Sequence, residues 1–270
     1  MQDNSTGNLS SGSLHIPPRP EVVTALMEEK AKAEPNFRRI ARLITSDVGL
    51  SAAMIKAVNS PAFGMEPKLA SVPLALQTLG PQQVARIATE LVTRNLSGGK
   101  TASLERFWDS AEKSALLCAR IAAKLHGISS DEAYSYGLFH DCGIPLLMKH
   151  FPRYKDVLIA ANSSVGQSFT ACEEAGVGTH HAVVGYFLTR SWNLPDVLCQ
   201  ATLRHHELDV FEVEQGNHML DFIGIGHLAE HAHHLSARNG EDVEWNKYEH
   251  AVLEHFGLSD EDYQDIVEGT

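Results

Sequence analysis

Histidine and aspartate side chains that could hold a metal ion gather in three adjacent pairs in the second half of the chain. In chain order they are His140, Asp141, His180, His181, His205 and His206. Adjacent residues of a helix point about 100° apart, so such a pair builds a metal site only where other helices converge on it. Neutral imidazole nitrogens with a carboxylate suit iron, manganese, zinc or nickel. The alternative is that these histidines are buried and hydrogen-bonded to backbone carbonyl groups.

The composition is that of a folded protein with an acidic bias. Of 270 residues, 43% are hydrophobic, which is enough to bury a core without disulfides. Lys and Arg number 22 against 34 Asp and Glu, so the formal net charge is −12, and no nucleic-acid partner is expected. Residues 207–270 hold 16 of the acidic side chains and only 2 of the basic ones. This acidic quarter is expected to be solvated, with a basic partner as the alternative.

The sequence contains no stretch typical of a membrane span or a secretion signal. No apolar run approaches the roughly 20 residues that cross a bilayer, and the first 13 residues are polar. The four cysteines are scattered and form no C-x-x-C pair, which indicates reduced thiols. These features predict a cytoplasmic protein with no membrane partner.

Helical periodicity extends along most of the chain, and we find no convincing alternation typical of strands. Apolar residues recur at three- and four-residue spacing, for example over residues 37–44. Gly80 and Pro81 predict the start of one helix, and Ser129 with Glu132 has the pattern of a capping box at the start of another. The sequence therefore predicts an all-α fold.

Changes in composition divide the chain into segments. The first residues are rich in Ser, Asn and Gly, and the segment 95–100 (NLSGGK) has the composition of a linker. We expect a disordered tail over 1–13, an N-terminal helical subdomain over 14–98, a second helical subdomain over 99–235 and an acidic helical extension over 236–270.

Short motifs in a fixed order identify a family resemblance over about residues 14–235. The segment 138–143 (LFHDCG) looks like the namesake motif of the HD superfamily of helical metal-dependent phosphohydrolases. Further motifs are similar to the HDOD family, the HD-related output domain of bacterial signalling proteins. They are IPPRPEVV at 16–23, SDVGL at 46–50, VNSPAFG at 58–64, AxxxLG at 75–80, FW at 107–108, GxxxHHAVVG at 176–185, WNLP at 192–195 and HH at 205–206. The resemblance implies a helical N-terminal subdomain packed on an HD-like helical bundle.

The resemblance also implies a set of metal ligands. The downstream acidic ligand of the HD superfamily falls in the helix containing residues 225–230, where Glu230 or His227 could replace the usual aspartate. The ligands that the resemblance carries over to this chain are His140, Asp141, His181, His205, His206 and Glu230. The implied cofactor is a divalent ion of iron, manganese, zinc or nickel.

Two departures from the HD pattern bear on catalysis. The upstream histidine ligand of HD phosphohydrolases falls at Asp109 or Ser110, and a lysine that often follows the doublet is replaced by Ile144. The chain therefore lacks one ligand and a positive group that could stabilise phosphate. HDOD domains are in general regarded as non-catalytic, which agrees with these losses.

The leading hypothesis is a bacterial signal-transduction module of the HDOD type, which acts without catalysis by binding a protein partner or a small, nucleotide-like ligand. The alternative is a divergent metal-dependent phosphohydrolase, in which Asp141 is the bridging or water-orienting carboxylate. A third reading is an interaction scaffold in which the polar cluster only contributes to stability.

One further histidine group, formed by His231, His233 and His234, lies near the end of a predicted helix. Residues at i, i+2 and i+3 do not share one narrow helix face. We therefore interpret these three histidines as a solvated helix end.

Overall fold

The computed structural model describes residues 16–96, 104–213, 217–237 and 240–268. These residues form helices, turns and loops and contain no strand, so the predicted all-α fold is confirmed. The predicted tail over residues 1–13 and the predicted boundary between residues 98 and 99 lie outside the described residues. The division into four segments therefore stays a prediction.

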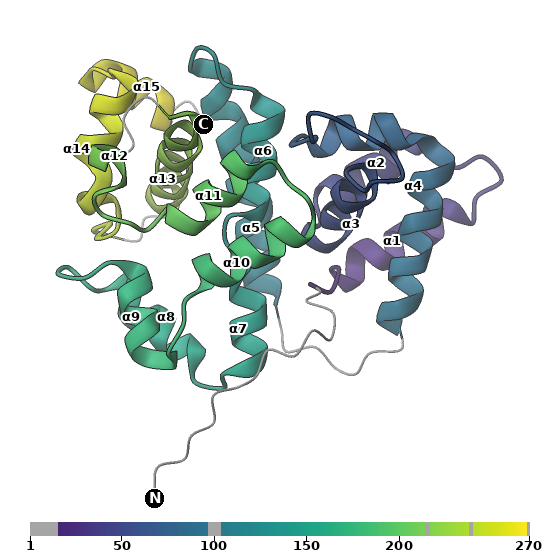
Figure 1. Cartoon of the computed structure of the whole chain (residues 1–270), viewed down its shortest axis with the longest axis horizontal. Helices are drawn as coiled ribbons and strands as arrows, with labels where there is room; N and C mark the ends of the chain where they lie inside the picture. Colours follow the sequence, from purple (N-terminus) through teal and green to yellow (C-terminus); the bar gives the residue numbers. More distant parts are fainter. Residues whose placement is uncertain (1–15, 97–103, 214–216, 238–239, 269–270) are drawn as a thin grey trace, which may run out of the picture.

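The described residues form four helices before residue 97 and eleven after residue 103 (Figure 1). The first four are α1 (Pro20–Lys30), α2 (Phe37–Thr45), α3 (Val48–Val58) and α4 (Val72–Leu96). The others are α5 (Glu105–Lys124), α6 (Ser130–Phe139), α7 (Ile144–His150), α8 (Tyr154–Asn162), α9 (Phe169–Val177), α10 (His181–Ser191), α11 (Asp196–Arg204), α12 (Val210–Val213), α13 (His218–Ser236), α14 (Trp245–Phe256) and α15 (Asp260–Glu268).

Helix ends in both parts follow from side chains that cap them. Asn36 and Asp47 accept backbone N–H groups at the starts of α2 and α3, and Ser129 Oγ accepts the Glu132 N–H at the start of α6, as the capping pattern predicts. Gly80 has a φ of +72°, which interrupts the helical path of α4 directly before Pro81. The predicted helix start at Gly80 is thus a kink inside α4.

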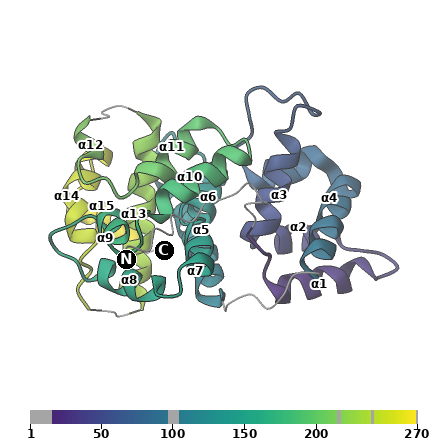
Figure 2. The same ribbon diagram turned by 60° about the horizontal axis from the view of Figure 1, so that its bottom comes forward.

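The first four helices lie against α6 and the α10–α11 connection (Figures 1 and 2), and Arg19, directly before α1, is paired with Asp109 of α5. The Val72 N–H donates to Ser135 Oγ at 3.0 Å, and the Tyr134 hydroxyl donates to the Thr45 carbonyl at 3.0 Å. The Asn59 side-chain amide donates to the carbonyls of Leu69 and Asn193, at 2.9 Å each. Buried polar contacts of this kind fix the orientation of the two parts.

Helix α13 is the central element of the second part. It contacts α5, α6, α11, α14 and α15, and its residues are buried on most sides. Close approach of α5 and α6 requires Gly137, because a Cβ at this position would lie 2.6 Å from the Ser114 carbonyl oxygen. The tight packing of α5, α6 and α13 places the end of α6 opposite the middle of α13.

One sequence interpretation in this region is wrong. His231 is buried, with 7% of its surface exposed, and its Nδ1 lies 2.8 Å from Asp242 Oδ2. Its ring stacks on Trp245 at a centroid distance of 4.6 Å. Residues of α14 and of the segment before it therefore cover His231, which would be exposed to solvent on α13 alone. His233 and His234 are partly exposed and line the cavity described below.

The length and hydropathy of the helices also bear on membranes. Within the described ranges, we find no helix whose length and apolar character would let it span a bilayer.

Candidate metal centre

The ends of three helices and the middle of a fourth carry the side chains that converge on one point. His140 and Asp141 follow directly after α6, His181 is the first residue of α10, and His205 and His206 follow directly after α11. Glu230 lies within α13. The structure thus brings together all six residues that the sequence singled out as ligands, which we call the six-residue centre.

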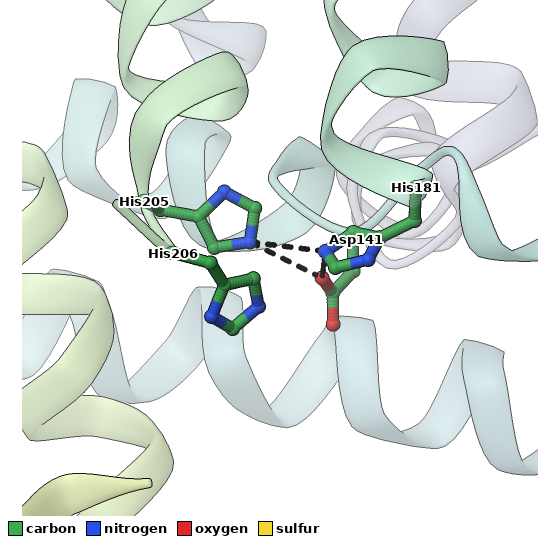
Figure 3. A group of neighbouring side chains, drawn as sticks. All are labelled: Asp141, His181, His205 and His206. Atoms are coloured by element: carbon green, nitrogen blue, oxygen red, sulfur yellow. Dashed lines mark hydrogen bonds and ion pairs between the residues drawn. The ribbon is translucent and has the colours of Figure 1, made fainter. Parts of the chain in front are cut away.

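Four members of the centre form a first group, which Figure 3 shows. Asp141 Oδ1 lies 3.2 Å from His181 Nε2 and 3.7 Å from His205 Nε2, and these two nitrogens are 3.1 Å apart. His206 completes the group, whose ligand atoms all lie within 4.8 Å of one another. Two imidazole nitrogens and a carboxylate oxygen therefore point at the same small volume.

A second group shares Asp141 with the first. His140 Nε2 lies 3.0 Å from Glu230 Oε1 and 3.6 Å from Asp141 Oδ2. These three residues again place ligand atoms within 4.8 Å of one another. Since the two oxygens of Asp141 face different groups, this carboxylate lies between two possible ion positions.

The remaining ring nitrogen of each histidine is held by another acceptor. His140 Nδ1 lies 3.0 Å from the Gly137 carbonyl, His205 Nδ1 lies 2.8 Å from the Thr202 carbonyl, and His206 Nδ1 lies 2.9 Å from Glu244 Oε1. A carbonyl or carboxylate accepts only from a protonated nitrogen, so in the neutral rings of His140 and His205 Nε2 carries the lone pair. Lone pairs and carboxylate oxygens that face one another repel unless a proton or a cation lies between them.

Asp141 provides the test of whether these residues fit a metal ion. Its Oδ1 is buried and has no hydrogen-bond partner of good geometry in the described structure. Buried polar atoms are normally paired, and an unpaired carboxylate oxygen beside imidazole nitrogens is what a metal ligand looks like without its ion. The donor set therefore fits a divalent transition-metal ion.

Charge within the centre shifts the pKa values of its members in opposite directions. Burial opposes the charged form of Asp141, but the imidazoles of His140, His181 and His205 hold its pKa well below the usual range. Burial would lower the pKa of His140, yet Asp141 and Glu230 raise it to about 9. The pKa of His181 is raised to about 10 by Asp141 and Glu173 in the same way. Protons held by these two histidines balance the carboxylates when no ion is bound.

The other two histidines behave differently. Burial and the neighbouring imidazoles lower the pKa of His205, and they hold that of His206 well below its ordinary value. Both rings are therefore neutral near pH 7 and ready to act as ligands, because only a neutral imidazole coordinates a metal.

A cavity of about 300 Å³ reaches the centre and gives it access to small molecules. Asp141, His181, His206 and Glu230 form part of its lining, and Ser110 and Ile144 form another part. None of the described residues that line this cavity is Lys or Arg. The two positions at which the sequence departs from the HD pattern thus face the same space as the ligands.

The structure decides between two pairs of alternatives that the sequence left open. Asp109 points away from the centre and its Oδ1 lies 2.8 Å from Arg19 Nη2, so Ser110 occupies the place near the missing histidine. His227 Nε2 donates to the His205 carbonyl at 2.8 Å, and its ring stacks on Tyr248 at 3.9 Å. Glu230, rather than His227, therefore belongs to the centre.

Gly143 brings the α6–α7 turn against the start of α10. A Cβ built on Gly143 would lie 2.1 Å from the His181 carbonyl oxygen and 2.9 Å from the Gly185 nitrogen. We expect Gly143→Ala to lower the free energy of unfolding by at least about 2 kcal/mol, because backbone atoms must move apart to relieve the overlap. Urea denaturation of this variant and of Gly166→Ala, where nothing lies within 4 Å, measures the effect. Equal stability of the two variants would contradict the prediction.

His227 gives the fold a dependence on pH that is separate from metal binding. Burial lowers its pKa to about 4, against the opposing charge of Glu230, whereas the pKa is about 6.5 in an unfolded chain. The unfolded chain therefore binds the proton more readily, and stability that is present above pH 6.5 is lost as the pH falls towards 4. We expect a loss of about 2–3 kcal/mol at pH 4.5.

Comparison with His227→Gln isolates this contribution, because glutamine retains a donor for the His205 carbonyl and cannot ionise. Metal-free protein of both sequences would be unfolded in urea at pH 7 and at pH 4.5. The loss of stability between the two pH values should be smaller in the variant by this amount. An equal loss in both proteins would show that His227 is not the titrating group.

Two acidic residues beside the centre, one buried and one partly buried, had no signal in the sequence. Glu173 in α9 is fully buried, and its Oε2 lies 2.6 Å from His181 Nδ1. Glu244, directly before α14, is bonded both to His206 and to Lys247 Nζ at 2.6 Å. Neither lies in a motif with a candidate ligand, and each contacts its histidine from another element. These contacts can therefore be identified only from the folded structure.

Comparison with known proteins supports the same family along most of the chain. The HDOD domain profile matches residues 16–208, which include α1 to α11. A protein of Treponema pallidum (strain Nichols) is 25% identical over 215 residues, which make up 77% of this chain and 41% of that protein. The chain thus spans about two fifths of the length of that relative.

Solved structures show the same arrangement of helices. The response regulator MmoQ from Methylococcus capsulatus (strain Bath) matches with a TM-score of 0.70 at 21% identity, covering 94% of this chain and 98% of that one. A virulence factor from Campylobacter jejuni matches with a TM-score of 0.63 at 15% identity, covering 93% and 92%. At these identities the likeness shows the fold alone. Since the family profile extends over well more than half of the chain, the protein belongs to the HDOD family.

Proposed function

We propose that this chain is a metal-binding signalling module that does not hydrolyse its ligand. The observation that carries the proposal is that six ligands converge while the two positions facing them, Ser110 and Ile144, carry neither a ligand nor a positive charge. The ion would be held by the six-residue centre. A protein partner would recognise whether the ion is bound and whether a ligand occupies the cavity.

The chemistry of the cavity wall argues against efficient phosphate-ester hydrolysis. Phosphoryl transfer needs positive groups around the transferred phosphate, and Lys and Arg are missing from the described lining. Asp141, Glu230, Asp242 and Glu244 instead place four carboxylates around the cavity. A phosphate group that enters would meet negative charge unless bound ions compensate for it.

A signalling role agrees with the description of one structural neighbour as a response regulator. We therefore propose a signalling protein or a small, nucleotide-like molecule as the binding partner. Nucleic acid does not fit, because the formal net charge is −12. A membrane surface does not fit either, for the same reason.

A second candidate function is a divergent metal-dependent phosphohydrolase. The position of Asp141 favours it, because its oxygens face two ligand groups and it also lines the cavity. A bound divalent ion would polarise a phosphoryl oxygen and lower the pKa of water. In that case Asp141 would hold or orient the ion, and Glu230 and His206 would shape the place where the substrate lies.

Elemental analysis of protein purified without a chelator and without a polyhistidine tag tests the proposal directly. Wild type and the His140→Ala/Asp141→Ala double variant would be measured side by side. We expect close to one equivalent or more of iron, manganese, zinc or nickel in wild type and a loss of that metal in the variant. The absence of metal in wild type after incubation with each of the four ions would overturn the proposal.

Turnover assays separate the two candidate functions. The metal-loaded protein would be incubated with phosphomonoester and phosphodiester substrates. No turnover above that of the double variant is expected for a signalling module. Metal-dependent hydrolysis that His140→Ala abolishes would instead establish the phosphohydrolase.

A further inference from the structure

His181 differs from His140 and His205 in what holds its second ring nitrogen. His140 and His205 each turn Nδ1 to the carbonyl three residues earlier, which the preceding helix supplies. His181 is the first residue of α10, and the chain before it leaves α9 through Gly178 in the left-handed region. A residue at the start of a helix has no preceding turn to accept from its side chain. His181 therefore needs an acceptor from elsewhere in the fold.

Glu173 is that acceptor. Its side chain is fully buried, and Oε2 lies 2.6 Å from His181 Nδ1, while the backbone N–H of His181 donates to both carboxylate oxygens at 3.3 Å. The Tyr154 hydroxyl donates to the other oxygen, Oε1. Two elements, α8 and α9, thus hold the carboxylate in place against the first turn of α10.

The charge of Glu173 is unusual for its surroundings. A buried carboxylate is costly unless it is paired and hydrogen-bonded. No Lys or Arg is bonded to Glu173 among the described residues, and the imidazole of His181 is its ionisable partner in the salt bridges of the structure. A neutral side chain could satisfy the same backbone N–H and hydroxyl donors at a lower desolvation cost. The 2.6 Å contact between Glu173 Oε2 and His181 Nδ1 therefore points to a role at the imidazole.

We propose that Glu173 is a positioning residue for the metal centre, which orients the His181 ring and makes its Nε2 a stronger ligand. This inference rests on the proposed function, since it deepens the account of the same site. The Nδ1–H of His181 donates to Glu173, so Nε2 faces Asp141 Oδ1 at 3.2 Å and His205 Nε2 at 3.1 Å. A carboxylate on the far nitrogen raises the electron density of the ring and fixes its tautomer, as carboxylate–histidine pairs do at metal sites.

The arrangement also has a mechanical aspect. Helices α8 and α9 pack chiefly on one another and touch α7 and α10 less extensively. Phe169, at the start of α9, stacks on the ring of His206 at 4.8 Å, and Lys247 of α14 donates to the Gln167 carbonyl at 2.9 Å. Through Glu173 and Phe169, the α8–α9 pair contacts two of the four histidines of the centre. A displacement of this pair would therefore turn the His181 ring.

Cobalt(II) binding to the full chain tests the assignment, because its visible absorption reports the number and kind of ligands. Glu173→Gln keeps an acceptor of the same size and removes the charge, and we expect it to weaken cobalt binding by about 10–100-fold. Glu173→Ala should weaken binding at least as much and should change the absorption spectrum. Asp47→Asn is the matched control, since Asp47 is another buried carboxylate at a helix start, far from the centre.

The crystal structure of the metal-free Glu173→Ala variant supplies a readout that needs no ion. We expect the His181 ring to rotate away from its wild-type orientation, whereas Asp47→Asn should leave it in place. Cobalt affinity in both Glu173 variants equal to that of wild type, together with an unchanged ring, would overturn the proposal.

The two possible failures are distinguishable. If wild type binds no cobalt or other divalent ion, the proposed function fails, and the orientation of His181 in the variant still decides whether Glu173 positions the ring. If wild type binds cobalt, the Glu173 variants bind it equally well and the His181 ring keeps its orientation, only the role of Glu173 is lost.

Discussion

Asp141→Asn is expected to weaken metal binding by at least about 100-fold, which is the largest effect that we predict for a single substitution. Even loss of a carboxylate that only orients a ligand histidine costs about 10–100-fold in affinity at metal sites. Asp141 is a member of both ligand groups, and its two oxygens face different histidines. Asparagine keeps the size of the side chain but removes the charge and one acceptor oxygen. Both ion positions should therefore be weakened together.

Isothermal titration calorimetry with zinc or manganese measures this loss. Asp156→Asn is a suitable control, because Asp156 is an exposed aspartate of α8 that takes no part in the centre. Urea denaturation of the metal-free proteins checks that Asp141→Asn still folds. Metal affinity within about threefold of wild type in a folded variant would show that the centre does not bind ions through Asp141.

The affinity for metal is expected to rise about tenfold for each unit of pH between 6 and 8. The pKa of His181 is raised to about 10, chiefly by Asp141 and Glu173 against the effect of burial, so its ring carries a proton over this whole range. That proton must leave before Nε2 can coordinate, and each proton displaced gives a factor of about ten per pH unit. His205 and His206 contribute no proton, because their lowered pKa values leave them neutral.

The same reasoning distinguishes the two ligand groups. The pKa of His140 is raised to about 9, so an ion that also uses His140 displaces a second proton and the dependence becomes about a hundredfold per pH unit. Calorimetry in buffers of different ionisation enthalpy counts the protons released. His140→Gln should reduce a two-proton release to one. An affinity that does not change with pH would contradict the protonated states of His140 and His181.

The sequence predicted which histidine and acidic side chains come together better than it predicted the residues around them. Pairs of His and Asp at helix ends are visible as a pattern, because helix ends are set by nearby residues such as Gly178 and Pro195. Glu173 and Glu244 were missed, because each contacts a histidine that lies on a different element. No spacing along one helix could indicate such contacts, since they depend on how helices pack.

The error at His231 has the same origin. Its position was judged from the faces of one helix, in a group with the partly exposed His233 and His234. Trp245 and Asp242 cover it, and both come from the segment that follows α13. The ambiguity between Asp109 and Ser110 was also one of packing, because the buried face of α5, which includes Trp108 and Ala111, sets the rotation of the helix about its axis. The packing of neighbouring helices therefore determines which of these side chains are buried, which the periodicity of one helix cannot predict.

The groups that meet at the centre are separated by very different lengths of chain, and this orders the folding of the protein. Glu173 and His181 are 8 residues apart, whereas His140 and Glu230 are 90 residues apart. Short loops close at a small entropic cost, so α9 and α10 can pack together early in folding. The group formed by His140, Asp141 and Glu230 forms only after α13 has packed against α6. An ion that needs ligands from both parts binds the native chain and not its intermediates. Occupancy of the proposed metal site would thus report completed folding and add to the stability of the native state alone.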